Sequence, residues 1–165
     1  MSSEPDLIEQ TVERLSLELG PVDLDCEPYP FNHSDYYRVE MGAALIKKLV
    51  SFRDLRQSFF LAPFKRRTSA CELLHRGPGG GRLVNVDPGY WSDAKLVLAS
   101  TKNYSHRIEI GRRVFAEVTL MVQKKVLTPL PWTYPDYRSS LVINFFSQVR
   151  NRYLEQIANY YNLKR

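Results

Sequence analysis

Residues 106–122, HRIEIGRRVFAEVTLMV, carry the clearest fold signal in this chain of 165 residues. Two runs in which apolar and polar residues alternate, 106–110 and 114–122, flank Gly111-Arg112. Alternation with a period of two is typical of half-buried strands, and a glycine-containing pair between two such runs favours a tight turn. The stretch therefore predicts an antiparallel β-hairpin.

Helical patterns lie at both ends of the chain. Apolar residues recur at helical spacing over 4–19, before Gly20-Pro21, and over 140–162, where Ser139 or Ser140 is a suitable N-cap. A further, strongly cationic helix is predicted over 63–75. Helices at both ends with strands between them predict a single α+β domain over 1–165. We expect its sheet to be mostly antiparallel and covered by the N-terminal helix and the long C-terminal helix.

The segments between the helices give strand signals of unequal strength. Residues 22–26 alternate as a half-buried strand does, and 47–53 favour a strand over a helix. Residues 82–86 follow a glycine-rich connector and are also predicted to form a strand. The pattern over 92–100 fits either a short helix or a strand, whereas three prolines within 127–135 predict irregular structure.

Composition places the chain among ordinary globular proteins. Charged residues make up 25% and the hydrophobic set 44%, a balance that excludes collagen-like, coiled-coil and disordered chains. No apolar run approaches the roughly 18 residues of a membrane span, and the acidic N-terminus does not resemble a secretory signal. Two cysteines cannot build a four-cysteine zinc site or a disulfide framework. We therefore expect a cytoplasmic protein with no membrane partner.

Charge is distributed unevenly along the chain. Residues 1–40 carry ten acidic and two basic residues, a balance of −8, whereas 41–165 carry eight acidic and 21 basic residues, a balance of +13. A basic body attracts phosphate-bearing and other anionic partners. The alternative is that the lysines and arginines only keep the surface solvated.

Several strings of residues are specific enough to suggest a family. They include Asn85-Val86-Asp87-Pro88-Gly89-Tyr90, Ala116-Glu117-Val118-Thr119-Leu120 and Trp132-Thr133-Tyr134-Pro135-Asp136-Tyr137-Arg138. With these strings, and with Asp35-Tyr36-Tyr37, the sequence resembles the bacterial domain-of-unknown-function family 4416 over roughly residues 7–155. The resemblance implies a single-domain bacterial protein and brings no established activity.

The chain also departs from the pattern of that family. Relatives usually begin with an apolar strand before the first helix. Its absence ahead of Met1 implies an open sheet edge, where a partner strand or a second copy of the chain would pair as a homo-oligomer. Arg67-Thr68-Ser69 stands where relatives tend to have Lys-Thr-Asn, so no role of that asparagine carries over. Some relatives are labelled GTP-binding, but the glycines at 77–81 are not followed by the Lys-Ser/Thr pair of a phosphate-binding loop.

Polar side chains around the predicted hairpin form the first candidate site. Pairing about the predicted turn places His106 opposite Glu117. A carboxylate beside an imidazole orients it for general acid–base catalysis, and Asp87 is the third predicted catalytic residue. Lys102 and Arg107 are predicted to hold a phosphate or a carboxylate. These residues favour a small hydrolase or transferase, and the alternative is a cross-strand ion pair on a solvated face.

A proline-stiffened loop at 132–138 forms the second candidate site. It combines Trp132 and Tyr134 with Asp136 and Arg138. Aromatic faces and a guanidinium suit base stacking and nucleotide binding, and the alternative is that the aromatics only lock the loop onto the core. The leading hypothesis is therefore a cytoplasmic protein that binds a phosphate-bearing ligand, either a nucleotide or RNA.

Metal and cofactor signals are weak. No histidine pair has the spacing of a zinc motif, so neither a metal nor a cofactor is predicted. His33 and Asp35 come nearest to a shared metal site, because both would lie on one face of a strand.

Overall fold

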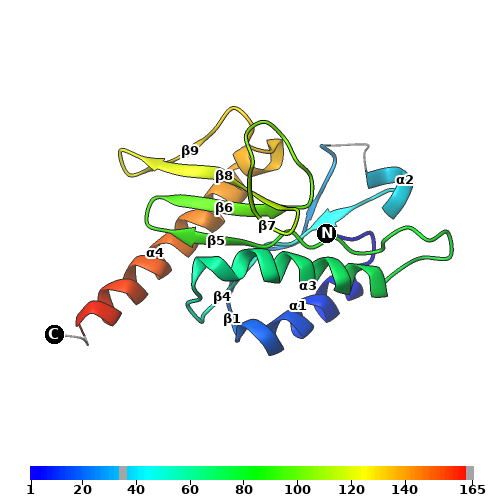
Figure 1. The fold of residues 1–165 in the computed structure, drawn as a ribbon, viewed down its shortest axis with the longest axis horizontal. Helices are drawn as coiled ribbons and strands as arrows, with labels where there is room; N and C mark the ends of the chain where they lie inside the picture. The colour runs from blue at the N-terminus through cyan, green and yellow to red at the C-terminus, as the bar shows by residue number, and fades with distance from the viewer. Residues whose placement is uncertain (34–36, 163–165) are drawn as a thin grey trace. The chain divides into compact units, whose positions relative to one another are not determined.

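A computed structural model describes residues 1–33 and 37–162 of the chain. Its helices and mostly antiparallel sheets confirm the predicted α+β class (Figure 1). The chain divides into two compact units, Met1–Pro88 and Gly89–Arg165, each with its own helices and antiparallel strands. The single domain over 1–165 stays a prediction.

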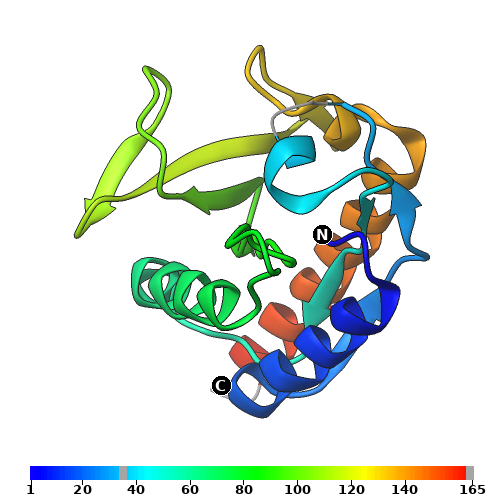
Figure 2. The same ribbon diagram turned by 90° about the vertical axis from the view of Figure 1, so that its right-hand side faces the viewer.

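The first unit is built from helices and short antiparallel strand pairs. Its elements are α1 (Pro5–Leu19), β1 (Val22–Asp25), β2 (Tyr29–Pro30), α2 (Arg38–Met41), β3 (Ile46–Lys47), β4 (Val50–Phe52), a 3₁₀ turn (Ser58–Phe60) and α3 (Leu61–Leu74). β1 pairs with β4, and β2 pairs with β3. α1 packs against β4 and buries Leu7, Ile8 and Thr11 (Figure 2). These elements confirm the predicted helices over 4–19 and 63–75 and the predicted strands over 22–26 and 47–53.

Ser2, near the start of the chain, forms antiparallel bridges to two other segments, at Ile46 and at Val84. Ser2 exchanges backbone hydrogen bonds with Ile46, at N···O distances of 3.1 and 2.8 Å, and is also bridged to Val84. The Ser2 hydroxyl donates to the Leu83 carbonyl at 2.6 Å. Because Ser2 is fully buried, these bonds satisfy polar groups that water does not reach.

The predicted strand over 82–86 is wrong. Within the described part of the chain the segment makes isolated bridges and no strand ladder. Its backbone is satisfied partly by other backbone groups, since the Leu83 amide donates to the His75 carbonyl at 2.9 Å and the Asn85 amide to the Met1 carbonyl at 2.8 Å. Side chains of α3 satisfy Val86. The Val86 amide donates to Glu72 Oε1 at 2.8 Å, and Lys65 Nζ donates to the Val86 carbonyl at 2.6 Å. The apolar residues of an extended segment do not reveal whether its backbone groups bond to a neighbouring strand or to separate groups elsewhere in the fold.

The second unit is an antiparallel sheet with a long helix packed on it (Figure 1). Its elements are β5 (Gly89–Ser92), β6 (Lys95–Ser100), β7 (Ile108–Gly111), β8 (Val114–Gln123), β9 (Val126–Pro129), a 3₁₀ turn (Pro135–Arg138) and α4 (Ser140–Asn162). The strand order is β5-β6-β8-β7, and β9 pairs with β8. α4 packs against β5, where the Phe146 ring stacks with Trp91 and Tyr137 at centroid distances of 6.5 and 5.6 Å. The predicted helix over 140–162 is confirmed, and the Ser139 hydroxyl accepts from the Val142 amide at 3.4 Å, as an N-cap does.

Strands also occupy two segments for which the pattern was ambiguous or suggested irregular structure. Residues 92–100 are not helical, because β5 and β6 form a hairpin whose turn contains Asp93 at φ 41°. The prediction of irregular structure over 127–135 is wrong for its first residues, since Leu127 and Thr128 of β9 pair with β8. Pro129 ends that strand, a position where proline is tolerated.

The β7–β8 hairpin is confirmed (Figure 2). Its predicted register is wrong by one residue. Ile108 pairs with Ala116, and Glu109 pairs with Phe115. The turn is Arg112-Arg113, with φ of 52° and 60°, as in a type I′ turn, and the register shifts between Glu109 and the turn. His106 therefore precedes β7, and continuing the register places Arg107 opposite Glu117.

Two irregularities set the side-chain directions of β8. A register shift opposite Leu96/Val97 leaves Thr119 as an extra residue, so Glu117, Thr119 and Leu120 are all buried. The simple alternation predicted over 114–122 therefore breaks at Thr119. At the other end, Lys124-Lys125 joins β8 to β9 with φ of 48° and 69°. Each hairpin tip that flanks β8 is thus a pair of exposed basic residues in the left-handed region.

Candidate functional site

The predicted contact between His106 and Glu117 is present. Nε2 of His106 lies 2.9 Å from Oε2 of Glu117. A turn in which the Arg107 amide donates to the Tyr104 carbonyl at 2.9 Å precedes β7 and brings His106 beside β8. The Glu117 side chain is 2% exposed and that of His106 is 21% exposed, so a buried carboxylate holds a half-buried imidazole.

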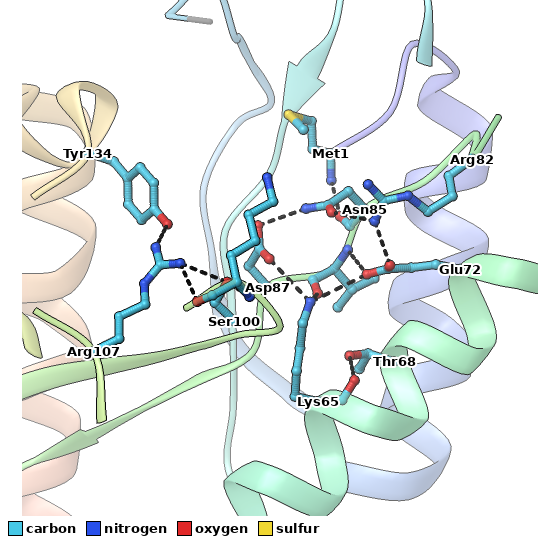
Figure 3. A network of polar contacts seen from close by, with 12 residues as sticks. Met1, Lys65, Thr68, Glu72, Arg82, Asn85, Asp87, Ser100, Arg107 and Tyr134 are labelled. Carbon is cyan, nitrogen blue, oxygen red and sulfur yellow. Dashed lines mark hydrogen bonds and ion pairs between the residues drawn. The ribbon is translucent and has the colours of Figure 1, made fainter. Parts of the chain in front are cut away.

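Arg107 binds the same carboxylate oxygen and three other groups. Its Nε donates to Glu117 Oε2 at 2.7 Å. Nη1 donates to Ser100 Oγ at 3.1 Å and to the Lys102 carbonyl at 2.9 Å, and Nη2 donates to the Tyr134 hydroxyl at 2.6 Å; Figure 3 shows Arg107 between Ser100 and Tyr134. Burial is the largest single effect and opposes the charge of the guanidinium, but the hydrogen bonds and charges of Glu117 and Tyr134 together outweigh it, so the pKa of Arg107 is raised above its ordinary value. Because its side chain is 4% exposed, Arg107 holds Glu117 and Tyr134 in place rather than presenting its charge to solvent.

Three rings lie nearly parallel beside this ion pair, and we call Tyr104, His106 and Trp132 the aromatic cluster. The His106 ring is 6.0 Å from the Tyr104 ring and 5.2 Å from the Trp132 ring, at interplanar angles of 14° and 12°. Tyr104 is 56% exposed and Trp132 is 39% exposed. The Trp132 indole N–H donates to the Val118 carbonyl at 2.8 Å, which fixes the ring against β8. The aromatic cluster therefore presents flat aromatic surface to solvent in a fixed orientation.

The loop at 132–138 is held by its own polar residues. Arg138 donates to the carbonyls of Leu130 at 2.7 Å, Thr133 at 3.2 Å and Pro131 at 3.3 Å. Asp136 is buried, at 1% exposure. Of the four residues predicted to bind a ligand here, Trp132, Tyr134 and Arg138 are exposed, although Arg138 also donates to carbonyls of the loop, whereas Asp136 is buried.

The remaining predicted residues lie in three places. Lys102 is in the loop that leads to Tyr104. Asp87 belongs to the first unit, where its carboxylate accepts from Asn85 Nδ2 at 2.7 Å and from Lys65 Nζ at 3.3 Å. Asp35 and Tyr36 lie outside the described residues, and among the described ones no group of three His, Cys, Asp or Glu side chains is placed to hold a metal ion.

The sequence of both units matches a known protein family. The family model described as Domain of unknown function (DUF4416) covers residues 1–153. The chain belongs to this family. No curated protein and no solved structure matches it. In this DUF4416 protein, the string at 132–138 supplies one ring of the aromatic cluster, and the string at 85–90 enters a polar network in the first unit.

The polar network of this DUF4416 protein was not predicted from the sequence. It consists of Glu40, Lys65, Glu72, Arg82, Asn85 and Asp87, most of which are drawn in Figure 3. Arg82 donates to Glu72 Oε2 at 2.8 Å and forms a two-point ion pair with Glu40 at 2.6 and 2.9 Å. Lys65 Nζ lies 3.6 Å from Glu72 and 3.3 Å from Asp87. The side chains of Lys65 and Glu72 are 4% and 3% exposed, so opposite charges balance one another inside the fold.

The network keeps its charged groups ionised. Burial opposes ionisation of the Asp87 carboxyl, but the charges of Lys65 and Lys47 and the hydrogen bond from Asn85 outweigh it, so the pKa of Asp87 is lowered from 3.8. The hydrogen bond to Glu40 raises the pKa of Arg82 against the opposing effect of burial. Because the charges of Lys65, Glu72 and Arg82 are mutually paired, we assign the network to holding residues 82–87 on α3.

A signal for this network was present in the sequence of α3. Lys65, Thr68 and Glu72 are spaced as one helical stripe, and all three are buried. The same spacing of apolar residues predicts a core face, but polar residues at these positions are typical of a solvated face. The stripe is buried because residues 82–87, which are distant in the sequence, pack on it and supply partners for Lys65 and Glu72.

Proposed function

We propose that the second unit of this DUF4416 protein binds a nucleotide or single-stranded RNA through the aromatic cluster. The observation that carries the proposal is the set of parallel rings whose outer members, Tyr104 and Trp132, are 56% and 39% exposed. Bases stack on such rings with about 1–3 kcal/mol each, and every base offers a flat face. Tyr134, also 39% exposed, extends the surface beside Arg107.

The charge of the second unit supports a phosphate-bearing ligand. Residues 89–165 contain twelve lysines and arginines against five acidic residues, a net charge of +7, whereas residues 1–88 carry eleven basic and thirteen acidic residues. Lys102 precedes Tyr104 in the same loop, and Arg112-Arg113 and Lys124-Lys125 are exposed at the two hairpin tips. Such a field attracts a polyanion and makes its affinity depend on salt.

We further propose that this binding takes place in the bacterial cytoplasm. The unpaired thiols of Cys26 and Cys71 suit a reducing compartment. No helix in the described ranges is both long and apolar enough to cross a membrane.

The test measures ligand binding through the fluorescence of Trp132, which belongs to the aromatic cluster. Trp91 is the other tryptophan of the chain and is buried, so a Trp91→Phe protein leaves Trp132 as the sole source of indole fluorescence. We expect saturable quenching on titration with a single-stranded oligoribonucleotide and weaker quenching with nucleoside monophosphates. The affinity should fall as the salt concentration rises from about 50 to about 200 mM, because contacts to phosphate weaken over this range. Fluorescence unchanged by both ligands at the lowest salt refutes the proposal.

A matched pair of tyrosine variants tests the aromatic cluster directly. We expect Tyr104→Ala to weaken binding by about 5- to 150-fold, the equivalent of one stacked base. Tyr161→Ala is the control, because Tyr161 lies in α4 of the same unit and is similarly exposed, at 62%. Equal affinities of the two variants would contradict the proposed role of the cluster.

A further inference from the structure

The imidazole of His106 has one nitrogen fixed by the protein. Nε2 is 2.9 Å from Glu117 Oε2, and an ionised carboxylate only accepts hydrogen bonds, so Nε2 carries the proton of the neutral ring. Nδ1 then carries a lone pair. No hydrogen bond joins Nδ1 to another residue in the part of the chain that the structure describes, and the side chain is 21% exposed.

The carboxylate that fixes Nε2 is itself held rigidly. Arg107 Nε donates to the same oxygen at 2.7 Å, and the other carboxylate oxygen accepts from Thr119 Oγ1 at 3.4 Å. Glu117 is 2% exposed, so these bonds lie where water does not compete. A buried carboxylate that sets the tautomer and direction of an imidazole is the arrangement by which enzymes position a histidine as a general base.

The aromatic cluster determines which groups come near Nδ1. A ring nitrogen lies in the plane of its ring, and the His106 plane is within 14° of the planes of Tyr104 and Trp132. The Arg107 guanidinium lies over the Tyr104 ring, 4.9 Å from its centroid, so Trp132 is the ring with the fewer contacts to its face. A base that stacks on Trp132 leaves its ribose and phosphate along the edge of the stack. The groups within reach of an imidazole edge are therefore ribose hydroxyls and phosphate oxygens.

We infer that His106 is the general base of a site that cleaves phosphodiester bonds in single-stranded RNA, an inference that rests on the proposed RNA binding. Nδ1 takes the proton of a ribose 2′-hydroxyl, and the 2′-oxygen forms a bond to the adjacent phosphorus. The bond from phosphorus to the 5′-oxygen breaks, and the leaving oxygen keeps the electron pair and takes a proton from water. The imidazolium returns its proton to solvent. The products are a 2′,3′-cyclic phosphate and a free 5′-hydroxyl, with no change of oxidation state.

The experiment compares cleavage with binding in variants that keep the aromatic stack. His106→Phe retains a ring between Tyr104 and Trp132 but has no base, and His33→Phe makes the same change at an exposed histidine of the first unit. The substrates are a single-stranded oligoribonucleotide and the same sequence in the 2′-deoxy form. We expect the wild type and His33→Phe to cleave only the ribo form, and His106→Phe to be slower by at least about 100-fold. RNA affinity is read from Trp132 fluorescence for each variant, and cleavage is compared at saturating RNA, so that a change in affinity caused by replacing a member of the aromatic cluster does not enter the comparison.

Glu117 acts through the imidazole and is a positioning residue. We expect Glu117→Gln to lower kcat by about tenfold or more while KM stays within about threefold, because the amide no longer favours a single tautomer. A merely structural role would change kcat and KM together or would lower the amount of folded protein. Circular dichroism on the same samples measures the folded fraction.

The outcomes separate the inference from the proposed function. RNA that binds but is not cleaved by the wild type overturns the inference and leaves the proposed function standing. Equal cleavage by the wild type and His106→Phe, purified in parallel, also overturns it, as does cleavage of the 2′-deoxy strand. Absence of RNA binding refutes the proposed function and the inference together.

Discussion

Replacing Glu72 by glutamine tests whether the polar network of the first unit holds its fold. Glu72 is 3% exposed and accepts from the Val86 amide at 2.8 Å and from Arg82 at 2.8 Å, with Lys65 at 3.6 Å. A glutamine side chain keeps the volume but offers one accepting oxygen and places an NH₂ group against a donor. Lys65 and Arg82 then each lose one of the carboxylates that balance their charges.

The magnitude follows from the partners that remain. Removing one member of a buried ion pair costs about 3–5 kcal/mol. Lys65 keeps Asp87 and the Val86 carbonyl, and Arg82 keeps Glu40, so we expect the lower end, about 3 kcal/mol. For a chain of this size 1 kcal/mol corresponds to about 2–4 °C, which gives a fall in Tm of about 6–12 °C.

The assay must read the first unit. Both tryptophans, Trp91 and Trp132, lie in the second unit, so their fluorescence follows that unit alone. Far-UV circular dichroism, to which α1 and α3 contribute together with α4, is recorded on the same samples during urea and thermal unfolding, and a change specific to the first unit appears in this signal without a matching change in fluorescence. Glu13→Gln on the exposed face of α1 is the matched control and should change the free energy of unfolding by no more than about 0.5 kcal/mol. A loss below about 1 kcal/mol for Glu72→Gln would show that the network is not what stabilises this unit.

Three further predictions concern stability. The pKa of Asp87 is lowered in the folded state, so its ionised form stabilises the fold above the ordinary value of 3.8, and this stabilisation is lost as the pH falls through the folded pKa. Asp87→Asn should therefore give urea midpoints that depend less on pH between about 5 and 2 than those of the wild type, and identical profiles would contradict the pairing with Lys65. Gly89→Ala should destabilise by about 1–3 kcal/mol because its Cβ would lie 2.6 Å from the Val97 carbonyl oxygen, whereas Gly79→Ala, with no atom within 4 Å, should be neutral or slightly stabilising; chemical denaturation of both variants gives the comparison. Leu120→Ala, at a fully buried position of β8, should lower the free energy of unfolding by about 2–5 kcal/mol. A Tm within about 2 °C of the wild-type value, the equivalent of less than about 1 kcal/mol, would show that the position is not part of a packed core.

Elements with a strong local period could be predicted from the sequence. The helices that became α1 and α4 and the β7–β8 hairpin each carry an unbroken apolar pattern, and such patterns fix the type of an element. The contact between His106 and Glu117 was also predicted, although the register on which the prediction depended was one residue off. The contact survives because the turn before β7, rather than strand pairing, carries the imidazole to β8.

Features that depend on backbone irregularity or on distant partners could not be predicted. The extra residue at Thr119 has no local sequence signal, yet it decides which side chains of β8 are buried. Residues 82–86 have the apolar content of a strand, but their backbone bonds to separate groups: Leu83 to His75, Asn85 to Met1, and Val86 to two side chains of α3. The internal contacts of Arg107 involve four separate partners that only the folded loop brings together, so the sequence could not show them. The ligand contact predicted for Arg107 stays a prediction.

The two turns that flank β8 carry an energetic cost that an ordinary hairpin avoids. Arg112, Arg113, Lys124 and Lys125 all adopt positive φ, which costs about 1–2 kcal/mol for each residue with a Cβ, and Asn-Gly would relieve most of it. Substituting Asn-Gly at both tips should therefore give a more thermostable protein that has lost four positive charges. If RNA affinity in that protein falls less steeply with rising salt, the four cations at the turns contribute to the attraction of RNA. The backbone strain at these turns then accompanies a gain in electrostatic attraction.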